Sequence, residues 1–357
     1  MTTVNWLNIK YTGEEIDALK KALKYGDISG FSPVVEEFES ICSEFTGSKY
    51  ALACCNGTAA LIVSFMALER YYDKKLTIAV PTWTYIAPVN AADLVGNLVL
   101  VDSDLKSHNM SSELPDGIDV ICPVDMAGVP ADYQEFKKYN LPIISDAAES
   151  FGSTYNGQLV GTLADITTTS FQSAKIINTG EGGMIFTDNK DLAKICKDII
   201  NQGYGPKGYA EHSHIAKGYN FRLSALQAAI GCVQMTKLEE NLEKRRKVAE
   251  IYDQINSNHI EKHQIPGNCK TNNYSYLIML PSKKVRDALK SYLHSQDITT
   301  KLFSPVHKHQ PYENFKGLPN ADYIYDHHLR LPIHNEMTED MATYVAEKIY
   351  TGLRSSL

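Results

Sequence analysis

Four stretches of the sequence place chemically useful side chains directly after short apolar runs that are typical of buried strands. The stretches are CNGTA, PTWTYIAP, PIISDAAES and SFQSAKIINTGEGG, beginning at residues 55, 81, 142 and 170. The last is the least ordinary, because Lys175 puts a cation on a short connection between two apolar runs. A lysine amine in such a place can attack a carbonyl carbon and form an imine. The alternative is an amine that extends to water from a surface turn, as in most lysines.

The first stretch forms a strand-to-helix turn that can bind an anion. Gly57 lets the backbone come close to a ligand, and the positive end of the following helix favours negative charge. The hydroxyl of Thr58 adds a hydrogen-bond donor. Taken alone, the same residues also fit an ordinary helix N-cap.

The second and third stretches supply aromatic rings and a carboxylate. Trp83 and Tyr85 stand where a strand ends, and there they can stack on a flat ligand ring or simply form core. Asp146 ends an apolar strand and needs a partner, because a buried carboxylate without one takes up a proton. A protonated ring nitrogen is one possible partner, and a nearby arginine or a set of backbone amides is another.

Together these groups match the requirements of a single cofactor. Pyridoxal 5'-phosphate needs a phosphate cradle, an aromatic ring face, a carboxylate for its protonated pyridine and a lysine that forms an imine. The sequence therefore predicts that Lys175 stands between its two strands to hold this cofactor.

Strands and helices alternate around these stretches, as hydrophobic periodicity shows. Strands are expected at 50–53, 77–80, 97–101, 119–124, 142–145, 167–171, 183–187 and 275–280. Helices are expected at 13–25, 33–46, 57–70, 84–94, 130–139, 190–202, 222–255 (one or two), 283–295 and 339–353, with a loop rich in His and Pro before the last.

This alternation predicts an α/β fold in two parts. A large domain over residues 1–245 would hold a mostly parallel mixed sheet covered by helices, and a smaller α+β domain would span 246–357. Ligands of such sheets bind beyond the carboxyl ends of the strands. The four stretches above lie at those ends.

Composition argues against several classes of protein. The formal net charge of -7 disfavours a surface for nucleic acid or for an acidic membrane. The beginning of the sequence lacks the pattern of a secretory signal, and no apolar run approaches the roughly 20 residues of a membrane span. Seven cysteines without CxxC spacing favour reduced thiols and a cytoplasmic location.

The order of motifs resembles a known family. NGTAAL, PTWTYIA, PVDMAGVPAD, ISDAAESFGSTYNGQLVG, SFQSAK followed by GEGG, and GYNFRLSALQAAIG are similar to the DegT/StrS group of fold-type-I nucleotide-sugar aminotransferases. The similarity extends from ISGFSPVVEEFE to PVHKHQPY and LPIHNEMT, nearly the whole chain. It implies a homodimer with shared active sites. It also implies that L-glutamate gives its amino group to the cofactor, which passes it to a keto sugar carried on UDP, dTDP or GDP. The product would be an amino sugar for a surface glycan such as a lipopolysaccharide O-antigen.

The resemblance also implies roles for individual residues. Lys175 would bind the cofactor covalently and later move the substrate proton, with a pKa near the operating pH. Asp146 would pair with the pyridine nitrogen, and Glu149 would lie near the ring hydroxyl. The other implied cofactor contacts are Gly57, Thr58, Ala59 and Ser170 at the phosphate, Tyr85 on the ring face with Trp83 as the next candidate, and Asn220, with Arg222, at the phosphate of the neighbouring subunit.

Several positions depart from the family's pattern. Asp125 and Ala127 stand where His or Asn and Tyr are frequent, and Asn335 stands where the family often has Pro. Asp125 is expected on the substrate side, together with His307 and His309 of the polar loop. The identity of the amino-group acceptor is therefore open.

Other interpretations compete with this one. Family members that deoxygenate sugars carry His in place of the lysine, so Lys175 disfavours that reaction. A cyclitol ketone or a keto sugar acid remains possible as acceptor. A non-enzymatic cofactor-binding paralogue is also possible, although no basic DNA-binding segment is evident.

Two further sites are disfavoured by the motifs that the sequence lacks. Neither GxGxxG nor GxxxxGK[ST] follows a strand, which argues against a nucleotide phosphate loop. The pair His307 and His309 has no convergent Cys or carboxylates, so no metal site is predicted.

Overall fold

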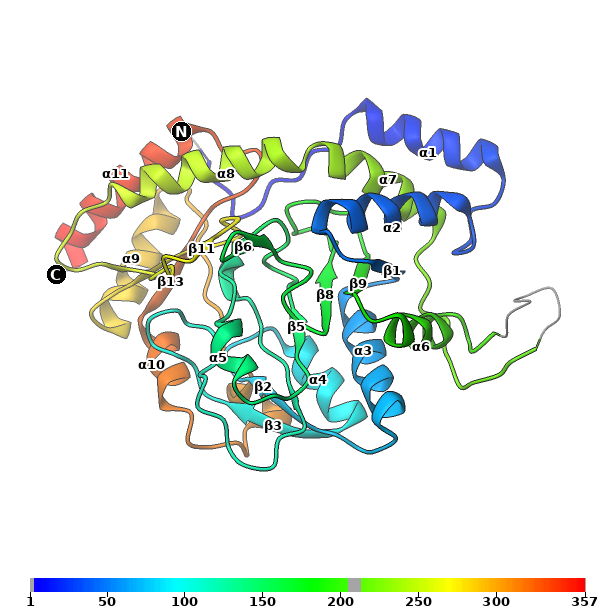
Figure 1. Cartoon of the computed structure of the whole chain (residues 1–357). Helices are drawn as coiled ribbons and strands as arrows, with labels where there is room; N and C mark the ends of the chain where they lie inside the picture. The colour runs from blue at the N-terminus through cyan, green and yellow to red at the C-terminus, as the bar shows by residue number, and fades with distance from the viewer. Residues whose placement is uncertain (1–2, 205–212, 357) are drawn as a thin grey trace.

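A mixed sheet forms the centre of the computed structural model, which describes residues 3–204 and 213–356 (Figure 1). One ladder runs in the order β1-β9-β8-β5 and a second in the order β3-β2-β4, and single bridges from Ile121 to Ile143 and from Val124 to Asp146 join them. Within these ladders β9 alone is antiparallel to its neighbours, which confirms the predicted mostly parallel sheet. The strands are β1 (Tyr50–Cys54), β2 (Thr77–Pro81), β3 (Asn97–Val101), β4 (Val120–Ile121), β5 (Ile144–Asp146), β8 (Ile166–Ser170) and β9 (Gly183–Thr187).

Helices cover both faces of this sheet because its strands are apolar on both sides. Ala51 and Ala53 of β1 pack in a core with α2 and α7, whereas Leu52 and Cys54 pack in a core with α3 and α6. Figure 1 shows α2 and α7 above the strands and α3 and α6 below them. The helices of this part are α1 (Gly13–Tyr25), α2 (Pro33–Thr46), α3 (Gly57–Tyr72), α4 (Ile86–Val95), α5 (Tyr133–Lys137), α6 (Lys190–Ile200) and α7 (Ala225–Thr236).

A smaller antiparallel sheet, β10-β12-β13, packs with the helices α8, α9 and α11. The predicted loop before the last helix is partly wrong, because that stretch also forms η3, η4, α10 and β13. The elements of this part are β10 (Glu261–Lys262), β12 (Tyr276–Met279), β13 (His328–Leu331), α8 (Leu238–Asp253), α9 (Lys283–Ser295), α10 (Pro319–His327), α11 (Glu339–Ser356), η3 (Val306–Lys308) and η4 (Gln310–Tyr312). The remaining short elements are β6 (Thr154–Tyr155), β7 (Gln158–Leu159), β11 (Cys269–Lys270) and η1 (Met126–Gly128).

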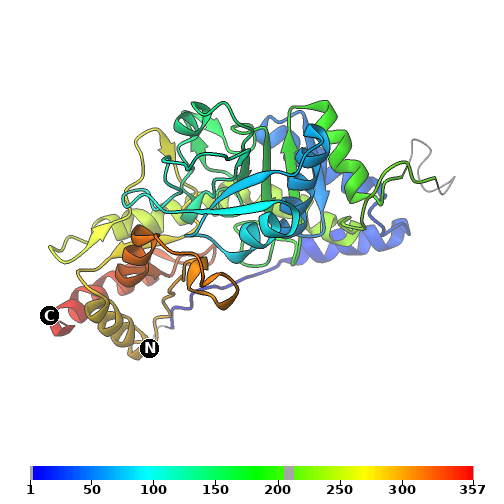
Figure 2. The same cartoon turned by 90° about the horizontal axis from the view of Figure 1, so that it is seen from below.

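The N-terminal segment links the two parts of the chain. Val4 pairs with Ile298 and belongs to the core of the C-terminal part, and the chain then crosses to α1 (Figure 2). Residue Arg245 lies inside α8, so one continuous helix spans the predicted boundary between residues 245 and 246. The division into two domains stays a prediction.

No helix within residues 3–204 and 213–356 is both long and apolar enough to cross a bilayer.

Candidate active site

The carboxyl ends of neighbouring strands bring several predicted cofactor residues to one edge of the sheet. Gly57 begins α3 just after β1, Asp146 ends β5, and Ser170 ends β8. A Cβ atom on residue 57 would lie only 2.9 Å from the Cβ of Ser170, so these two positions touch and residue 57 has room for glycine alone.

The start of α3 can both cap itself and bind an anion. The side-chain oxygen of Asn56 accepts a hydrogen bond from the Ala59 amide at 2.8 Å. The amides of Gly57 and Thr58 have no acceptor among the residues that the structure describes, and Thr58 is exposed. The amide of Ala59, predicted at the phosphate, is therefore used by the cap, while two amides at the positive helix end remain for a ligand.

Lys175 lies beside two carboxylates and under an aromatic ring. Its Nζ atom is 4.7 Å from the centre of the Tyr274 ring. Burial opposes the charged form of the amine, but Tyr274, Glu149 and Asp146 outweigh burial and raise the pKa of Lys175. In the chain by itself these neighbours favour the ammonium form. The expected pKa near the operating pH concerns the amine released beside a bound cofactor, and it stays a prediction.

The carboxyl group of Asp146 is buried, so that its ionised form needs a cationic partner. Burial raises the pKa of its carboxyl to about 6, although the amide of Ala148, 3.0 Å from Oδ1, and the charge of Lys175 act in the opposite direction. Glu149 adds a nearby negative charge. A cation that approached this carboxylate would offset the cost of burying it.

Glu149 is fixed in place by the neighbouring loop. One carboxylate oxygen accepts a hydrogen bond from the amide of Ala127 at 2.8 Å, and Ala127 has a left-handed φ of 59°. The other oxygen lies 3.8 Å from Nη1 of Arg330 on β13. The Nε and Nη2 atoms of Arg330 are buried and lack partners in the described part of the chain.

The two aromatic candidates of the second stretch face different environments. Tyr85, at the start of α4, is 68% exposed and free to cover a ligand ring. Trp83 is fully buried, with its ring centre 5.3 Å from that of Phe303 and 4.8 Å from that of His328. The assignment of Trp83 as a cofactor contact is therefore corrected: its side chain belongs to the core.

Asp125 is also corrected, because it does not face a substrate. Its carboxylate is fully buried and accepts hydrogen bonds from the Ala131 amide at 2.8 Å, the Tyr133 hydroxyl at 2.8 Å and the Ser150 hydroxyl at 2.6 Å. Burial raises its pKa to about 7, and these donors act against that rise. Asp125 thus organises the chain between β4 and β5.

The two histidines of the polar loop differ in exposure, because His307 is buried and His309 is not. His307 bridges two segments, with Nδ1 2.7 Å from the Thr82 hydroxyl and Nε2 3.0 Å from an oxygen of Asp322. His309 is exposed. Within residues 3–204 and 213–356, no three His, Cys, Asp or Glu side chains lie where they could share a metal ion.

Asn220 and Arg222 lie together near the end of β1. Asn220 is exposed, and Arg222 makes a bridge with Cys54 while its guanidinium lies 4.8 Å from the ring centre of Phe31. The Nη1 atom of Arg222 is buried without a hydrogen-bond partner among the described residues. Their predicted contact with a second subunit stays a prediction.

A cavity of about 490 Å³ adjoins Lys175. It lies between the N-terminal segment, the junction of α7 with α8, and the loop after β13. Its ionisable lining is mixed: Lys10, Lys175, Lys237, Lys244, Arg245 and His334 are basic, and Glu14, Glu240 and Glu336 are acidic. A space of this size fits an ordinary small-molecule ligand.

Comparison with known proteins identifies the family. Residues 10–350 match the model of the DegT/DnrJ/EryC1/StrS aminotransferase family. The chain belongs to this family. The resemblance seen in the motifs is thereby confirmed, and the protein is an enzyme that transfers nitrogenous groups.

Characterised relatives of this family member cover nearly its whole length. The chain is 31% identical over 350 residues to the GDP-perosamine synthase of Escherichia coli O157:H7, with 95% of both chains covered. It is 32% identical over 373 residues to the UDP-4-amino-4,6-dideoxy-N-acetyl-beta-L-altrosamine transaminase of Campylobacter jejuni subsp. jejuni serotype O:23/36 (strain 81-176), with 99% of this chain and 98% of the relative covered. A candidate sugar aminotransferase of Streptococcus pneumoniae, Spr1654, solved in its PLP form, shares the fold with a TM-score of 0.90, at 22% identity over the whole of both chains.

Sequence reasoning missed Tyr274 and Arg330, which the fold brings to Lys175 and Glu149. Tyr274 stands in a polar turn before β12, and Arg330 stands within β13. Neither position has a local pattern that indicates a site, because each reaches the large sheet only through tertiary packing.

Proposed function

We propose that this aminotransferase moves the amino group of L-glutamate to a keto group of a deoxy sugar linked to UDP, dTDP or GDP, with pyridoxal phosphate as its cofactor. The names of the relatives support a nucleotide-linked sugar as acceptor. The product would be an amino sugar for a surface glycan such as an O-antigen, made in the cytoplasm.

One observation carries the proposal: the amine of the half-buried Lys175 lies beside Asp146 and Glu149 at the same edge of the sheet as the open helix end at Gly57. The donor set fits the cofactor. The carboxylate of Asp146 calls for a cation such as a protonated ring nitrogen, and the free amides of Gly57 and Thr58 call for an anion such as a phosphate.

Each residue then has a stated task. When bound, pyridoxal phosphate withdraws electrons from the carbon that carries the amino group. The neutral amine of Lys175 would take up the proton released from that carbon, hold it on Nζ and return it during the transfer. Asp146 would keep the ring nitrogen protonated, and Tyr85 would cover the ring face. Glu149 orients the ring hydroxyl.

We further propose a homodimer in which Asn220 and Arg222 of one subunit contact the cofactor phosphate of the other. The exposed side chain of Asn220, close to the end of β1, supports this, because it is open to a contact from a second subunit. A cyclitol ketone or keto sugar acid is the alternative acceptor.

An absorbance spectrum tests the cofactor and the donor. Purified protein incubated with pyridoxal phosphate should turn yellow, and glutamate should bleach the colour. A protein that stays colourless contradicts the proposal. Thermal-shift measurements with UDP, dTDP and GDP test the acceptor: stabilisation by one of them supports a nucleotide-linked sugar, whereas no shift with any favours the alternative acceptors.

A further inference from the structure

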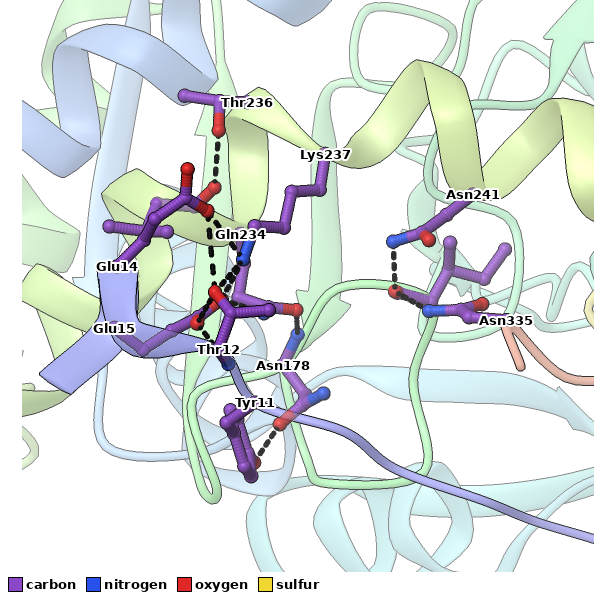
Figure 3. A network of polar contacts seen from close by, with 12 residues as sticks. Tyr11, Thr12, Glu14, Glu15, Asn178, Gln234, Thr236, Lys237, Asn241 and Asn335 are labelled. Atoms are coloured by element: carbon purple, nitrogen blue, oxygen red, sulfur yellow. Dashed lines mark hydrogen bonds and ion pairs between the residues drawn. The ribbon is translucent and has the colours of Figure 1, made fainter.

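The backbone that follows Lys175 is held from the small C-terminal sheet and from α8 (Figure 3). The side-chain amide of Asn335, in the loop after β13, donates to the carbonyl oxygen of Ile176 at 2.7 Å. Asn241 of α8 donates to the same oxygen at 3.5 Å. Both side chains therefore hold the carbonyl group of Ile176, the residue next to Lys175.

The other side of this loop is held by the N-terminal segment. The Tyr11 hydroxyl donates to the side-chain oxygen of Asn178 (Figure 3). Gln234 of α7 and Lys237, which stands between α7 and α8, anchor that segment by donating to Glu15. Glu15 is buried, and hydrogen bonds from Lys237, Thr12 and Gln234 outweigh burial and lower its pKa to about 2. The loop after Lys175 is thus held by hydrogen bonds on both sides, from Asn241 and Asn335 on one and from the N-terminal segment on the other.

Arg245 connects this loop to the ring above the lysine. Residue Arg245 is only 2% exposed, and burial lowers the pKa of its guanidinium to about 10. Its Nε donates to the side-chain oxygen of Asn335 at 2.8 Å, and its Nη1 donates to the carbonyls of Asn273, Tyr274 and Ile333 at 3.1–3.2 Å. One cation therefore fixes both Tyr274, whose ring lies over Lys175, and Asn335.

We propose that Asn335 is a positioning residue for Lys175, joining the backbone after the lysine to the fixed guanidinium of Arg245. This inference rests on the proposed function. Asn335 uses both ends of its amide, one toward Ile176 and one toward Arg245. The contact keeps the lysine amine in place beside Asp146 and Glu149.

Single-turnover bleaching of the cofactor-loaded enzyme by glutamate tests the effect on proton transfer. Asn335→Ala should slow bleaching about 10- to 100-fold, the cost of misplacing a reacting group by roughly 1 Å. The Kd of glutamate should stay within about twofold, because this contact orients the lysine rather than the donor. With α-deuterated glutamate the isotope effect should rise, since proton transfer becomes the slower step.

Two further variants separate positioning from general damage. Asn335→Asp keeps an acceptor for Arg245 but cannot donate to Ile176, so it should slow bleaching as the alanine variant does. Asn320→Ala is the matched control, because it removes a comparable hydrogen bond far from the lysine: the side-chain amide of Asn320 donates to the Ser103 carbonyl oxygen at 2.8 Å. Wild-type rates and isotope effects in both Asn335 variants overturn the proposal.

Hydrogen exchange in the cofactor-free protein gives a readout that needs no activity. Amides of the peptide that follows Lys175 should exchange at least about tenfold faster in Asn335→Ala than in wild type or Asn320→Ala. Unchanged exchange there overturns the positioning role. A wild-type enzyme that glutamate never bleaches contradicts the proposed function instead, and the exchange result still decides the role of Asn335.

Discussion

Replacing Asp146 with asparagine should stabilise the cofactor-free protein while weakening its hold on the cofactor. Burial raises the pKa of Asp146 from 3.8 to about 6, so the folded state prefers the protonated carboxyl. The pKa of Asp146 is higher in the folded state than in the unfolded state. Below about pH 4 the carboxyl is protonated in both states and does not lower the unfolding free energy. Above about pH 6 it is ionised in both states, and the unfolding free energy is lowered by the full amount. The shift of roughly 2 units corresponds to about 3 kcal/mol of unfolding free energy.

Asp146→Asn removes the charge but keeps an oxygen that can accept from the Ala148 amide. At pH 8 the cofactor-free variant should therefore be more stable than wild type by up to about 3 kcal/mol, or about 4 °C in melting temperature for a chain of this length. The difference should shrink as the pH falls from 7 to 5. Cofactor affinity should fall at least about tenfold, because the ring nitrogen loses a charged acceptor.

Urea unfolding of both proteins between pH 5 and 8 measures the stability, and absorbance titration measures the affinity. Asp119→Asn is a control of opposite sign, because hydrogen bonds from Lys74 and Thr77 lower the pKa of Asp119, so losing its charge should not stabilise the protein at pH 8. An Asp146→Asn protein that is no more stable than wild type at pH 8, or that binds the cofactor as tightly, refutes the reasoning.

Four other substitutions follow from the geometry. Tyr85→Ala should weaken cofactor binding by up to about tenfold in an absorbance titration without lowering the melting temperature, whereas Trp83→Ala should cost about 3–5 kcal/mol of unfolding free energy in urea melts. Asp125→Ala should lower the unfolding free energy by about 2–4 kcal/mol, because it leaves buried hydrogen-bond donors unpaired. Steady-state kinetics should show an unchanged KM for the acceptor, and a raised KM would restore Asp125 to the substrate side. Gly57→Ala should weaken cofactor binding in an absorbance titration and also cost about 1–3 kcal/mol of unfolding free energy in urea melts, since the new Cβ crowds Ser170 at the open helix end.

Much of the large sheet follows from local signals in the sequence. The helices at 13–25 and 33–46 have the predicted bounds, because glycines at 26 and 47 end them in left-handed conformations and a proline begins the second. The strand ends were also predictable, since short apolar runs alternate with helices. This places Asp146 and Ser170 at one edge without further information.

The direction of a side chain at a strand end is harder to predict. Trp83 and Asp125 follow strands, as Tyr85 does, yet both turn into the core because α10 and the chain around Tyr133 cover them. Local sequence does not contain that packing. The C-terminal helix α10 was missed for a related reason: it has few residues, so its pattern is too short to distinguish from a loop.

Residues from distant segments complete the site. Tyr274, Arg245 and Asn335 come from three separate elements and meet only because α8 and the small sheet pack against the loop after Lys175. Asn335 was visible as a departure from the family's pattern, but its task depends on a contact across 159 positions of sequence. Only the folded chain shows that contact.

Peptide mapping after borohydride treatment tests the central assignment most directly. Borohydride makes the bond between the cofactor and a lysine permanent, so the modified peptide can be found by mass spectrometry. The cofactor should be recovered on Lys175 in wild type, and no labelled peptide should appear in Lys175→Ala. Recovery of the cofactor on a different lysine, or on none in a protein that has turned yellow, contradicts the account.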